Sequence, residues 1–191
     1  MTENIFEKGL GKVPANFVPQ TPLGFLGWAN HVYPKKVAVI HGSNKYTYNE
    51  FSKRCLKLAS ALNKRGIKEG DTVAVMAPNS PPMLEAHFGV PMTGAVLNAL
   101  NFRLDAETIT FILEHGEAKV LIVDKEFSAV IKKAVTRIKR SLIIIGIDDP
   151  LAPDGETLGE ITYEEFLNQG DENFEWYMPS DEWSAISLNY T

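Results

Sequence analysis

The chain has 191 residues, of which 45% are hydrophobic and 23% are charged, the fractions of an ordinary folded protein with one large or two small domains. Its net charge is −5 with both signs interspersed, which disfavours a nucleic-acid or anionic-membrane partner because either would normally require a basic patch. The single cysteine, Cys55, excludes an internal disulfide and a cysteine-only metal cluster, and it fits a reducing compartment.

No apolar run approaches the roughly 18 residues of a membrane-spanning helix. The N-terminal residues MTENIFEKGLGKV lack the basic and then apolar pattern of a secretory signal. A cytoplasmic location is therefore expected, and the glycosylation sequon Asn189-Tyr190-Thr191 is interpreted as accidental.

Residues 1–36 are expected to form an N-terminal arm laid over the surface of one α/β domain, residues 37–191. The arm is rich in Gly and Pro, with one short helical pattern over residues 22–31. Two β-rich runs, residues 37–41 and 45–48, then flank the turn Gly42-Ser43-Asn44 and predict a β-hairpin.

A long amphipathic helix is predicted after the hairpin. Thr47 stands three residues before Glu50, the spacing of a capping box in which hydroxyl and carboxylate bond the orphan amides of the first turn. Apolar residues follow at helical spacing, and Gly66 supplies a left-handed stop. The apolar stripe consists of Phe51, Cys55, Leu58, Ala59 and Leu62. Cys55 is therefore interpreted as a small core residue rather than a reactive thiol.

The centre of the chain alternates apolar runs with helical patterns, as parallel strands joined by crossover helices do. The four predicted parallel strands are residues 72–77, 96–100, 119–123 and 142–147. They are apolar without alternation, so helices are expected on both faces of the sheet. The predicted fold class is thus α/β with a mostly parallel sheet.

The predicted helices of this unit differ in character. The one that begins at Ser80 is apolar nearly all round as far as Met92, so it is expected to be buried. Asp105 caps the next helix. The helix over residues 127–138 has a basic outer face, which is interpreted as solvated rather than as a phosphate site. A second capping box, Thr162 with Glu165, begins a short helix, and residues 184–189 are predicted to form a last strand.

Common motifs of nucleotide binding and hydrolysis are absent from the sequence. Gly9 and Gly11 begin a G-x-G, but no third glycine follows at the required spacing and no strand precedes them, so a Rossmann dinucleotide turn is not expected. The sequence also has no Walker loop, no G-x-S-x-G elbow and no H-E-x-x-H.

A few polar residues remain as candidates for a site. His87 lies on the helix expected to be buried, where it is either a site residue or a core histidine bonded to the backbone. Asp124 and the pair Asp148-Asp149 follow predicted parallel strands, at the edge where α/β sheets bind ligands. These carboxylates either hold Mg²⁺ or a ribose hydroxyl, or cap the turns that follow the strands.

Three blocks of the sequence closely resemble the N-terminal third of the AMP-forming acyl-CoA synthetases, which are adenylate-forming ligases. The blocks are YTYNEFSKRCLKLASALNKRGI, GDTVAVMAPNSPPMLEAHFGVPMTGAVLNALNFRLDAETITFILEHGEAKVLIVD and DEWSAISLNYT. The resemblance runs from about Thr21 to Thr191 and implies the N-terminal subdomain of the ligase fold. Within the family, the sequence looks most like ligases for short and medium acyl chains, such as 3-methylmercaptopropionyl-CoA ligases.

The resemblance implies a reaction in two steps. A carboxylate attacks ATP to give acyl-AMP and pyrophosphate, and the thiol of coenzyme A then displaces AMP to form a thioester. The family uses Mg²⁺ and a Ser/Thr/Gly-rich phosphate loop that ends in lysine. Tyr190 and Thr191 match the opening of that loop. Thr191 therefore carries over as an ATP-binding residue, whereas no catalytic or metal-binding residue carries over.

Two functions compete on this basis. The first is the N-terminal fragment of an ATP-dependent acyl-CoA ligase, inactive by itself. The second is a non-catalytic binding or assembly module with the same architecture. A homo-oligomer is also expected, because the apolar helix Met83–Met92 and the strand Leu142–Ile147 are not expected to be covered by the chain's own elements.

Overall fold

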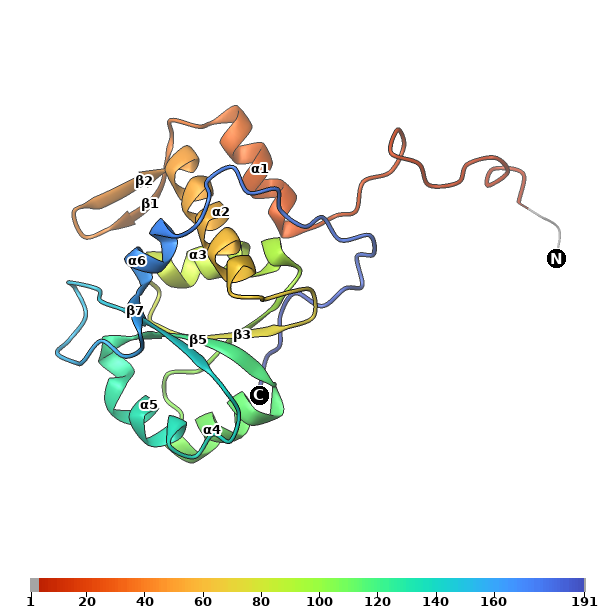
Figure 1. Ribbon diagram of the computed structural model, residues 1–191. Coiled ribbons are helices and arrows are strands. Elements are labelled where there is room, and N and C mark those ends of the chain that lie inside the picture. Colours follow the sequence, from red (N-terminus) through yellow and green to blue (C-terminus); the bar gives the residue numbers. More distant parts are fainter. Residues whose placement is uncertain (1–3, 191) are drawn as a thin grey trace.

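The structure, a computed structural model, describes residues 4–190 and has helices on both sides of a central sheet (Figure 1). The helices are α1 (Pro22–Val32), α2 (Tyr48–Lys64), α3 (Pro81–Gly89), α4 (Ala106–His115), α5 (Ser128–Val135) and α6 (Tyr163–Asn168), with the short 3₁₀ turns η1 (Pro91–Thr93) and η2 (Lys125–Phe127). The strands are β1 (Val37–His41), β2 (Asn44–Thr47), β3 (Thr72–Met76), β4 (Val96–Ala99), β5 (Ala118–Asp124), β6 (Ile143–Ile147) and β7 (Ile161–Thr162). Among these residues, none of the helices combines the length and apolarity that a membrane crossing requires.

The central sheet has five parallel strands in the order β4-β3-β5-β6-β7. Thr72 of β3 is in register with Val96 of β4, and Val73 with Val120 of β5. The sequence prediction of four parallel core strands is confirmed for β3, β4, β5 and β6. The sequence does not predict β7, because two residues are too few to show a strand period.

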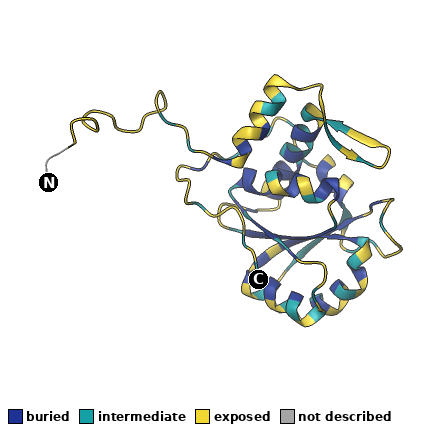
Figure 2. Ribbon diagram, turned by 180° about the vertical axis from the view of Figure 1, so that it is seen from behind, coloured by how far each residue is buried: buried dark blue, intermediate teal, exposed yellow. Residues whose placement is uncertain are grey.

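Alternate residues of β3 show why the sheet needs a helical layer on each face. Val73 and Val75 pack into the apolar cluster formed with α2, α3 and α6, whereas Ala74 and Met76 pack into the cluster formed with α4 and α5. All four side chains are fully buried, and Figure 2 shows the strands as a buried layer between the helices. A strand buried on both faces has no solvent side for polar residues, so its sequence does not alternate.

Helix α2 begins at the predicted capping box. The Thr47 hydroxyl accepts the Glu50 N–H at 3.3 Å, and the Glu50 carboxylate accepts the Thr47 N–H at 2.7 Å. Gly66 follows the helix with a φ of 83°. Cys55 is fully buried, and burial raises the pKa of its thiol, so its interpretation as a core residue is confirmed.

The N-terminal arm lies on the domain only in part. Helix α1 packs against α2 through Leu23 and Leu26. Residues 4–20 are almost all exposed and extend away from the sheet in Figure 1, so the expectation of an arm laid over the surface is wrong for them. Their apolar residues stand singly or in the pairs Ile5-Phe6 and Phe17-Val18 between Gly, Pro, polar and charged residues, so they offer no continuous face to bury. The boundary between residues 36 and 37 stays a prediction.

The sequence predicts that helix α3 is buried all round, but the structure buries only one face of it. Its inner face buries Glu85, Ala86 and Gly89, but Leu84 and His87 lie on an outer face that neither α2 nor the sheet covers. Strand β6 is better covered than expected, because its Ile145 and Ile147 are buried in the core. The expectation of uncovered faces, which motivated a homo-oligomer, is therefore confirmed for α3, whose Leu84 is 40% exposed, and wrong for Ile145 and Ile147 of β6.

The predicted last strand, residues 184–189, is reduced to a short parallel contact with β4. The Leu97 N–H donates to the Ile186 carbonyl at 3.0 Å, and the Leu188 N–H donates to the Leu97 carbonyl at 2.9 Å. The side-chain amide of Asn98 donates to the Leu188 carbonyl at 2.7 Å. This contact continues the parallel order on the outer edge of β4, but it involves too few residues to make a full strand.

Gly159 holds the loop between β6 and β7 against the sheet. Its φ is +95°, and an added Cβ would lie 2.2 Å from the Ile144 carbonyl oxygen. Gly159→Ala is expected to lower the free energy of unfolding by about 2–5 kcal/mol, because it combines left-handed backbone strain with overpacking.

Gly70→Ala is the matched control, since its φ is +79° and no atom lies within 4 Å of an added Cβ. It should cost only about 1–2 kcal/mol. Urea unfolding measures both variants, and equal losses would contradict a steric role for Gly159.

Candidate functional site

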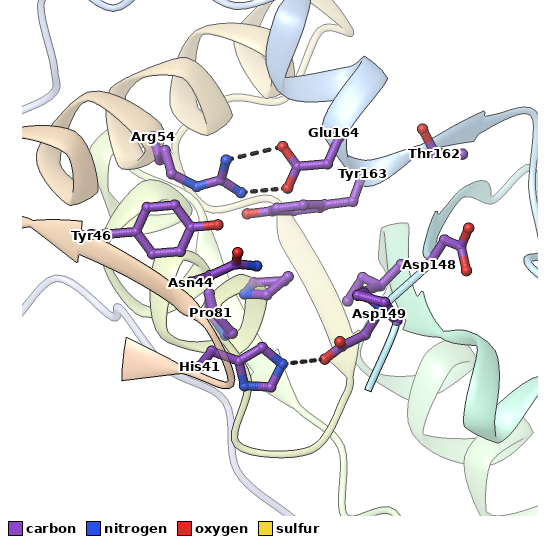
Figure 3. A pocket seen from close by; sticks show the side chains of 13 residues that line it. His41, Asn44, Tyr46, Arg54, Pro81, Asp148, Asp149, Thr162, Tyr163 and Glu164 are labelled. Carbon is purple, nitrogen blue, oxygen red and sulfur yellow. Dashed lines mark hydrogen bonds and ion pairs between the residues drawn. The ribbon is translucent and has the colours of Figure 1, made fainter. Parts of the chain in front are cut away.

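A pocket of about 340 Å³ opens between the β1–β2 hairpin and the carboxyl end of β6 (Figure 3). Its walls come from the hairpin, α2, the start of α3, the loop after β6 and the start of α6. Charged, aromatic and imidazole side chains line it, including His41, Tyr46, Arg54, Asp149, Tyr163 and Glu164. The pocket therefore collects polar groups from elements far apart in the sequence.

Arg54 of α2 bonds two carboxylates at the same time. Its Nε and Nη2 donate to Glu85 of α3 at 2.5 and 3.3 Å. Its Nη1 and Nη2 donate to Glu164 of α6 at 2.9 and 2.6 Å, the two contacts drawn in Figure 3. The Tyr163 hydroxyl donates to Glu85 at 2.8 Å, and the Tyr46 ring lies 5.0 Å from the guanidinium carbon.

The local sequence explains how these groups meet. The capping box of Thr162 and Glu165 begins α6, which puts Glu164 in the first turn, where a carboxylate is favoured by the helix dipole. Glu85 lies on the buried face of α3 and is 0% exposed. An isolated carboxylate at such a position is costly, so Arg54 and Tyr163 are the partners that make its burial tolerable.

The pKa shifts in this cluster follow from burial and pairing. Burial raises the pKa of Glu85 above its usual value, and the positive charge of Arg54 opposes that rise. Burial alone would lower the pKa of Arg54, but its bonds to Glu164 and the charge of Glu85 raise it. Burial, followed by the neighbouring Glu85 carboxylate, raises the pKa of the Tyr163 hydroxyl well above its usual value.

A second polar contact joins the hairpin to the loop after β6. His41 Nε2 lies 2.6 Å from Oδ2 of Asp149, as drawn in Figure 3. The other oxygen of Asp149 accepts the Leu151 N–H at 2.9 Å. Asp149 thus fixes a turn and, through His41, the end of β1.

The sequence candidates Asp124 and Asp148 do not meet in a common site. Asp124 is fully buried at the end of β5, where it accepts the Glu126 N–H at 3.0 Å and caps η2. Its Oδ2 has no hydrogen-bond partner within residues 4–190, and burial raises its pKa. Asp148 is exposed at the pocket and pairs with Lys125 at 2.8 Å. The capping alternative is confirmed for Asp124.

His87 is exposed, so the prediction of a core histidine is wrong. Its Nδ1 does lie 2.8 Å from the Met83 carbonyl oxygen, as expected for a histidine bonded to the backbone. With His41 it borders a second pocket of about 250 Å³ between β1 and α3. Thr191, the predicted ATP-binding residue, lies outside the described residues.

Sequence reasoning misses the cluster around Arg54. The available signal is Glu85, the single acidic residue of helix α3, whose other residues apart from His87 are apolar. A charge on a buried helical face requires a partner, which directs attention to basic residues beside the apolar stripe of α2. Because every terminal nitrogen of Arg54 is bonded to a carboxylate, the cluster acts as a brace between α2, α3 and α6 rather than as a group available for chemistry.

Removal of Arg54 tests this brace. Arg54→Met is expected to cost about 3–5 kcal/mol at neutral pH, because it leaves Glu85 charged and buried without a cation. In the variant, the folded-state pKa of Glu85 rises further above its unfolded value of about 4.3. The free energy of unfolding of the variant therefore falls as the pH rises from the unfolded pKa to the folded pKa, and it recovers when the pH is lowered and Glu85 is protonated.

Lys53→Met is the control from the same helix, because its ion pair with Glu172 is half exposed at 43% and 39%. It should change stability by at most about 1 kcal/mol. Thermal unfolding of both variants between pH 5 and pH 8 measures the difference; a deficit of Arg54→Met that stays constant with pH would argue against a buried, unpaired Glu85.

A family model described as AMP-binding enzyme matches residues 26–191 of the chain. The chain is 47% identical over 194 residues to the acetate/butyrate–CoA ligase AAE7, peroxisomal, of Arabidopsis thaliana, covering 95% of this chain and 34% of that protein. It is 44% identical over 196 residues to the acetate–CoA ligase CCL3 of Humulus lupulus, again covering 95% of this chain and 34% of that protein. The chain thus spans about a third of the length of these curated relatives.

Solved structures show the same fold. The anthranilate CoA ligase AuaEII in complex with anthranoyl-AMP superposes with a TM-score of 0.82 at 22% identity, covering 94% of this chain and 34% of that chain. The Mycobacterium tuberculosis fatty acyl CoA synthetase superposes with a TM-score of 0.72 at 24% identity, covering 88% and 32%. The expected subdomain of the adenylate-forming ligase fold is therefore confirmed. Since the family model covers most of its length, the chain belongs to the family of AMP-binding enzymes.

Proposed function

We propose that the chain is the N-terminal part of an ATP-dependent acyl-CoA ligase that activates a short or medium-chain carboxylic acid. The observation that carries this proposal is the 47% identity to an acetate/butyrate–CoA ligase over 95% of the chain. The parallel sheet of β3 to β6, shared with CoA ligases of known structure, supports it.

In the proposed reaction, a carboxylate oxygen bonds the α-phosphorus of ATP, and pyrophosphate leaves with its bonding electrons. The thiolate sulfur of coenzyme A then bonds the acyl carbon of acyl-AMP, and AMP leaves. The first step replaces a poor leaving group with a good one. Thr191 is proposed as the opening residue of the phosphate loop, where amide and hydroxyl donors stabilise the charge on the transferred phosphoryl group.

We assign no residue of this chain to Mg²⁺, which is proposed as a partner of ATP in the whole ligase. Within residues 4–190, no three His, Cys, Asp or Glu side chains are grouped so as to hold a metal ion. Asp148 is already paired with Lys125, and Asp124 caps η2. In this proposal, the carboxylates after β5 and β6 therefore stabilise the fold and do not bind a metal ion.

The proposed substrate is a small aliphatic acid. Acetate and butyrate stand in the name of the Arabidopsis relative, acetate in that of CCL3, and 2-methylpropanoate in that of the Humulus ligase CCL4, which is 40% identical. The methylmercaptopropionate implied by the sequence resemblance belongs to the same class. We propose cytoplasmic action, although the Arabidopsis relative is named as peroxisomal. Imaging of a fluorescent fusion of the whole protein decides between the two compartments.

For the whole protein that contains this chain, we expect ATP- and coenzyme A-dependent formation of acetyl-CoA or butyryl-CoA, with release of AMP and pyrophosphate. Mass spectrometry of the thioester and a coupled AMP assay measure it. In the absence of coenzyme A, hydroxylamine should trap the acyl-AMP as a hydroxamate. Benzoate and anthranilate are the comparison acids, and a higher kcat/KM with either would contradict an aliphatic substrate. No turnover with any acid would favour the non-catalytic module.

The 191-residue chain by itself is expected to catalyse acid-dependent ATP–pyrophosphate exchange at least roughly a thousandfold more slowly than the whole protein, because the donors of the phosphate loop are missing from it. Exchange by the isolated chain at the rate of the whole protein would overturn this expectation.

We also propose that the chain self-associates. Large aromatic side chains stay exposed on it, among them Phe25, Trp28 and Trp183. Contiguous exposed apolar patches larger than a few hundred Å² are uncommon on monomers. These side chains, together with Leu84 on the uncovered outer face of α3, are the proposed contact surface, whereas β6 is not part of it.

A further inference from the structure

The segment of residues 186–190 lies along the outer edge of β4. It makes two backbone hydrogen bonds with Leu97, and the bridge between Leu97 and Ser187 is parallel. The segment therefore runs in the same direction as β4, toward the carboxyl edge of the sheet, where α/β folds bind ligands. The next residue in the chain is Thr191, which is proposed to open the phosphate loop.

A buried side chain of β4 fixes the register of this segment. Asn98 is 1% exposed, and its Nδ2 donates to the Leu188 carbonyl at 2.7 Å. A shift of the segment by one residue would remove that carbonyl and leave the buried donor unpaired, which is costly. The path of the chain is therefore set as far as Leu188.

Helix α4 holds the segment again at Tyr190. The Tyr190 hydroxyl oxygen lies 2.7 Å from Nδ1 of His115, in the last turn of α4. The Tyr190 ring stands edge-on to the rings of His115 and Phe111, with centroid distances of 5.8 and 6.4 Å. Phe111 and His115 are themselves stacked, 5.2 Å apart. Tyr190 thus has one polar contact and two favourable ring contacts with a single helix.

The glycine after α4 allows the helix to come this close. A Cβ added at Gly116 would lie 3.2 Å from the Tyr190 hydroxyl oxygen and 3.2 Å from Cδ2 of Leu188. Both distances are shorter than ordinary van der Waals contact between such atoms. A side chain at position 116 would therefore press against both ends of the stretch from Leu188 to Tyr190.

We infer that His115 is a positioning residue for ATP binding in the whole ligase, because it fixes through Tyr190 the direction in which the chain enters the phosphate loop. This inference rests on the proposed function, and in particular on the proposed role of Thr191. Asn98 and His115 hold the chain on either side of Asn189. Ordering the start of a binding loop in advance lowers the entropy cost of binding its ligand.

A purely structural role for His115 makes a different prediction. In that case the contact with Tyr190 only attaches the segment to the fold, so its loss lowers stability and leaves the affinity for ATP unchanged. If His115 acts as a positioning residue, its loss weakens the binding of ATP in a protein that is still folded.

Isothermal titration calorimetry of the whole protein with MgATP, without acid or coenzyme A, separates the two roles. Tyr190→Phe, which keeps the ring, and His115→Ala are each expected to raise the Kd for ATP roughly tenfold. The double variant should also show roughly a tenfold rise, because both substitutions remove the same contact. The KM values for butyrate and coenzyme A should stay within about twofold, since neither binds the phosphate loop in the proposed reaction.

Glu107→Ala is the matched control from the same helix. Glu107 is exposed in the first turn of α4, at the opposite end from His115. This substitution should leave the Kd for ATP within about twofold. Circular dichroism of all four variants should show the folded protein.

Hydrogen exchange of the whole protein gives a readout that does not depend on activity. If the contact favours ATP binding, ATP must favour the contact by the same factor. Saturating ATP is therefore expected to slow exchange of the Leu188 amide, which donates to the Leu97 carbonyl, roughly tenfold in the unsubstituted protein and at most about twofold in Tyr190→Phe.

The outcomes distinguish this inference from the proposed function. A whole protein that binds no ATP overturns the proposed function and this inference with it. If the whole protein and both single variants bind ATP equally well, or if ATP slows exchange equally in Tyr190→Phe, the positioning role is overturned and the proposed function stands. A rise of roughly a hundredfold in the double variant would mean that the two residues act separately, which overturns the Tyr190 hydroxyl as the link from His115.

Discussion

The buried carboxylate of Glu85 is the constraint on which the upper helical layer depends. A charge that is 0% exposed must be paired, and its partners Arg54 and Tyr163 come from α2 and α6. Its contacts therefore join three helices that are separated in the chain. Apolar packing alone would hold the same helices together, but it would tolerate sliding and rotation that a bidentate contact does not. The contacts of Glu85 with Arg54 and Tyr163 also position the walls of the pocket that α2 and α6 form.

The parts of the fold that follow from local chemistry are predictable from the sequence. The capping boxes at Thr47 and Thr162 are specified by spacing over three residues, and the buried strands β3 to β6 by uninterrupted apolar runs. Features that depend on neighbouring elements, such as which helix face is buried, are not predictable from local sequence. The exposed face of α3 at Leu84 and His87 depends on where α2 and the sheet end, and β7 exists because β6 offers it an edge.

The candidate site likewise has a part that the sequence predicts and a part that it does not. The general rule for parallel sheets places Asp124 and Asp149 at the carboxyl edge, and the structure has both there, but as the caps of turns. Arg54 and Glu164 are 110 residues apart, and no sequence motif or hydrophobic periodicity predicts that they meet. Only the chemical cost of a buried Glu85 points to such a contact, and it does not say which basic residue supplies it.

The contact of residues 186–188 with β4 has a consequence for synthesis of the chain. Asn98 and Leu188, which this contact joins, are 90 residues apart, so β4 leaves the ribosome long before the segment that pairs with its outer edge. At translation rates of about 5–20 residues per second, the interval is roughly 5–20 s. During it, β4 presents unpaired amide and carbonyl groups that neighbouring nascent chains are able to bond. The newly made chain is therefore most prone to aggregation through β4 before residues 186–188 arrive.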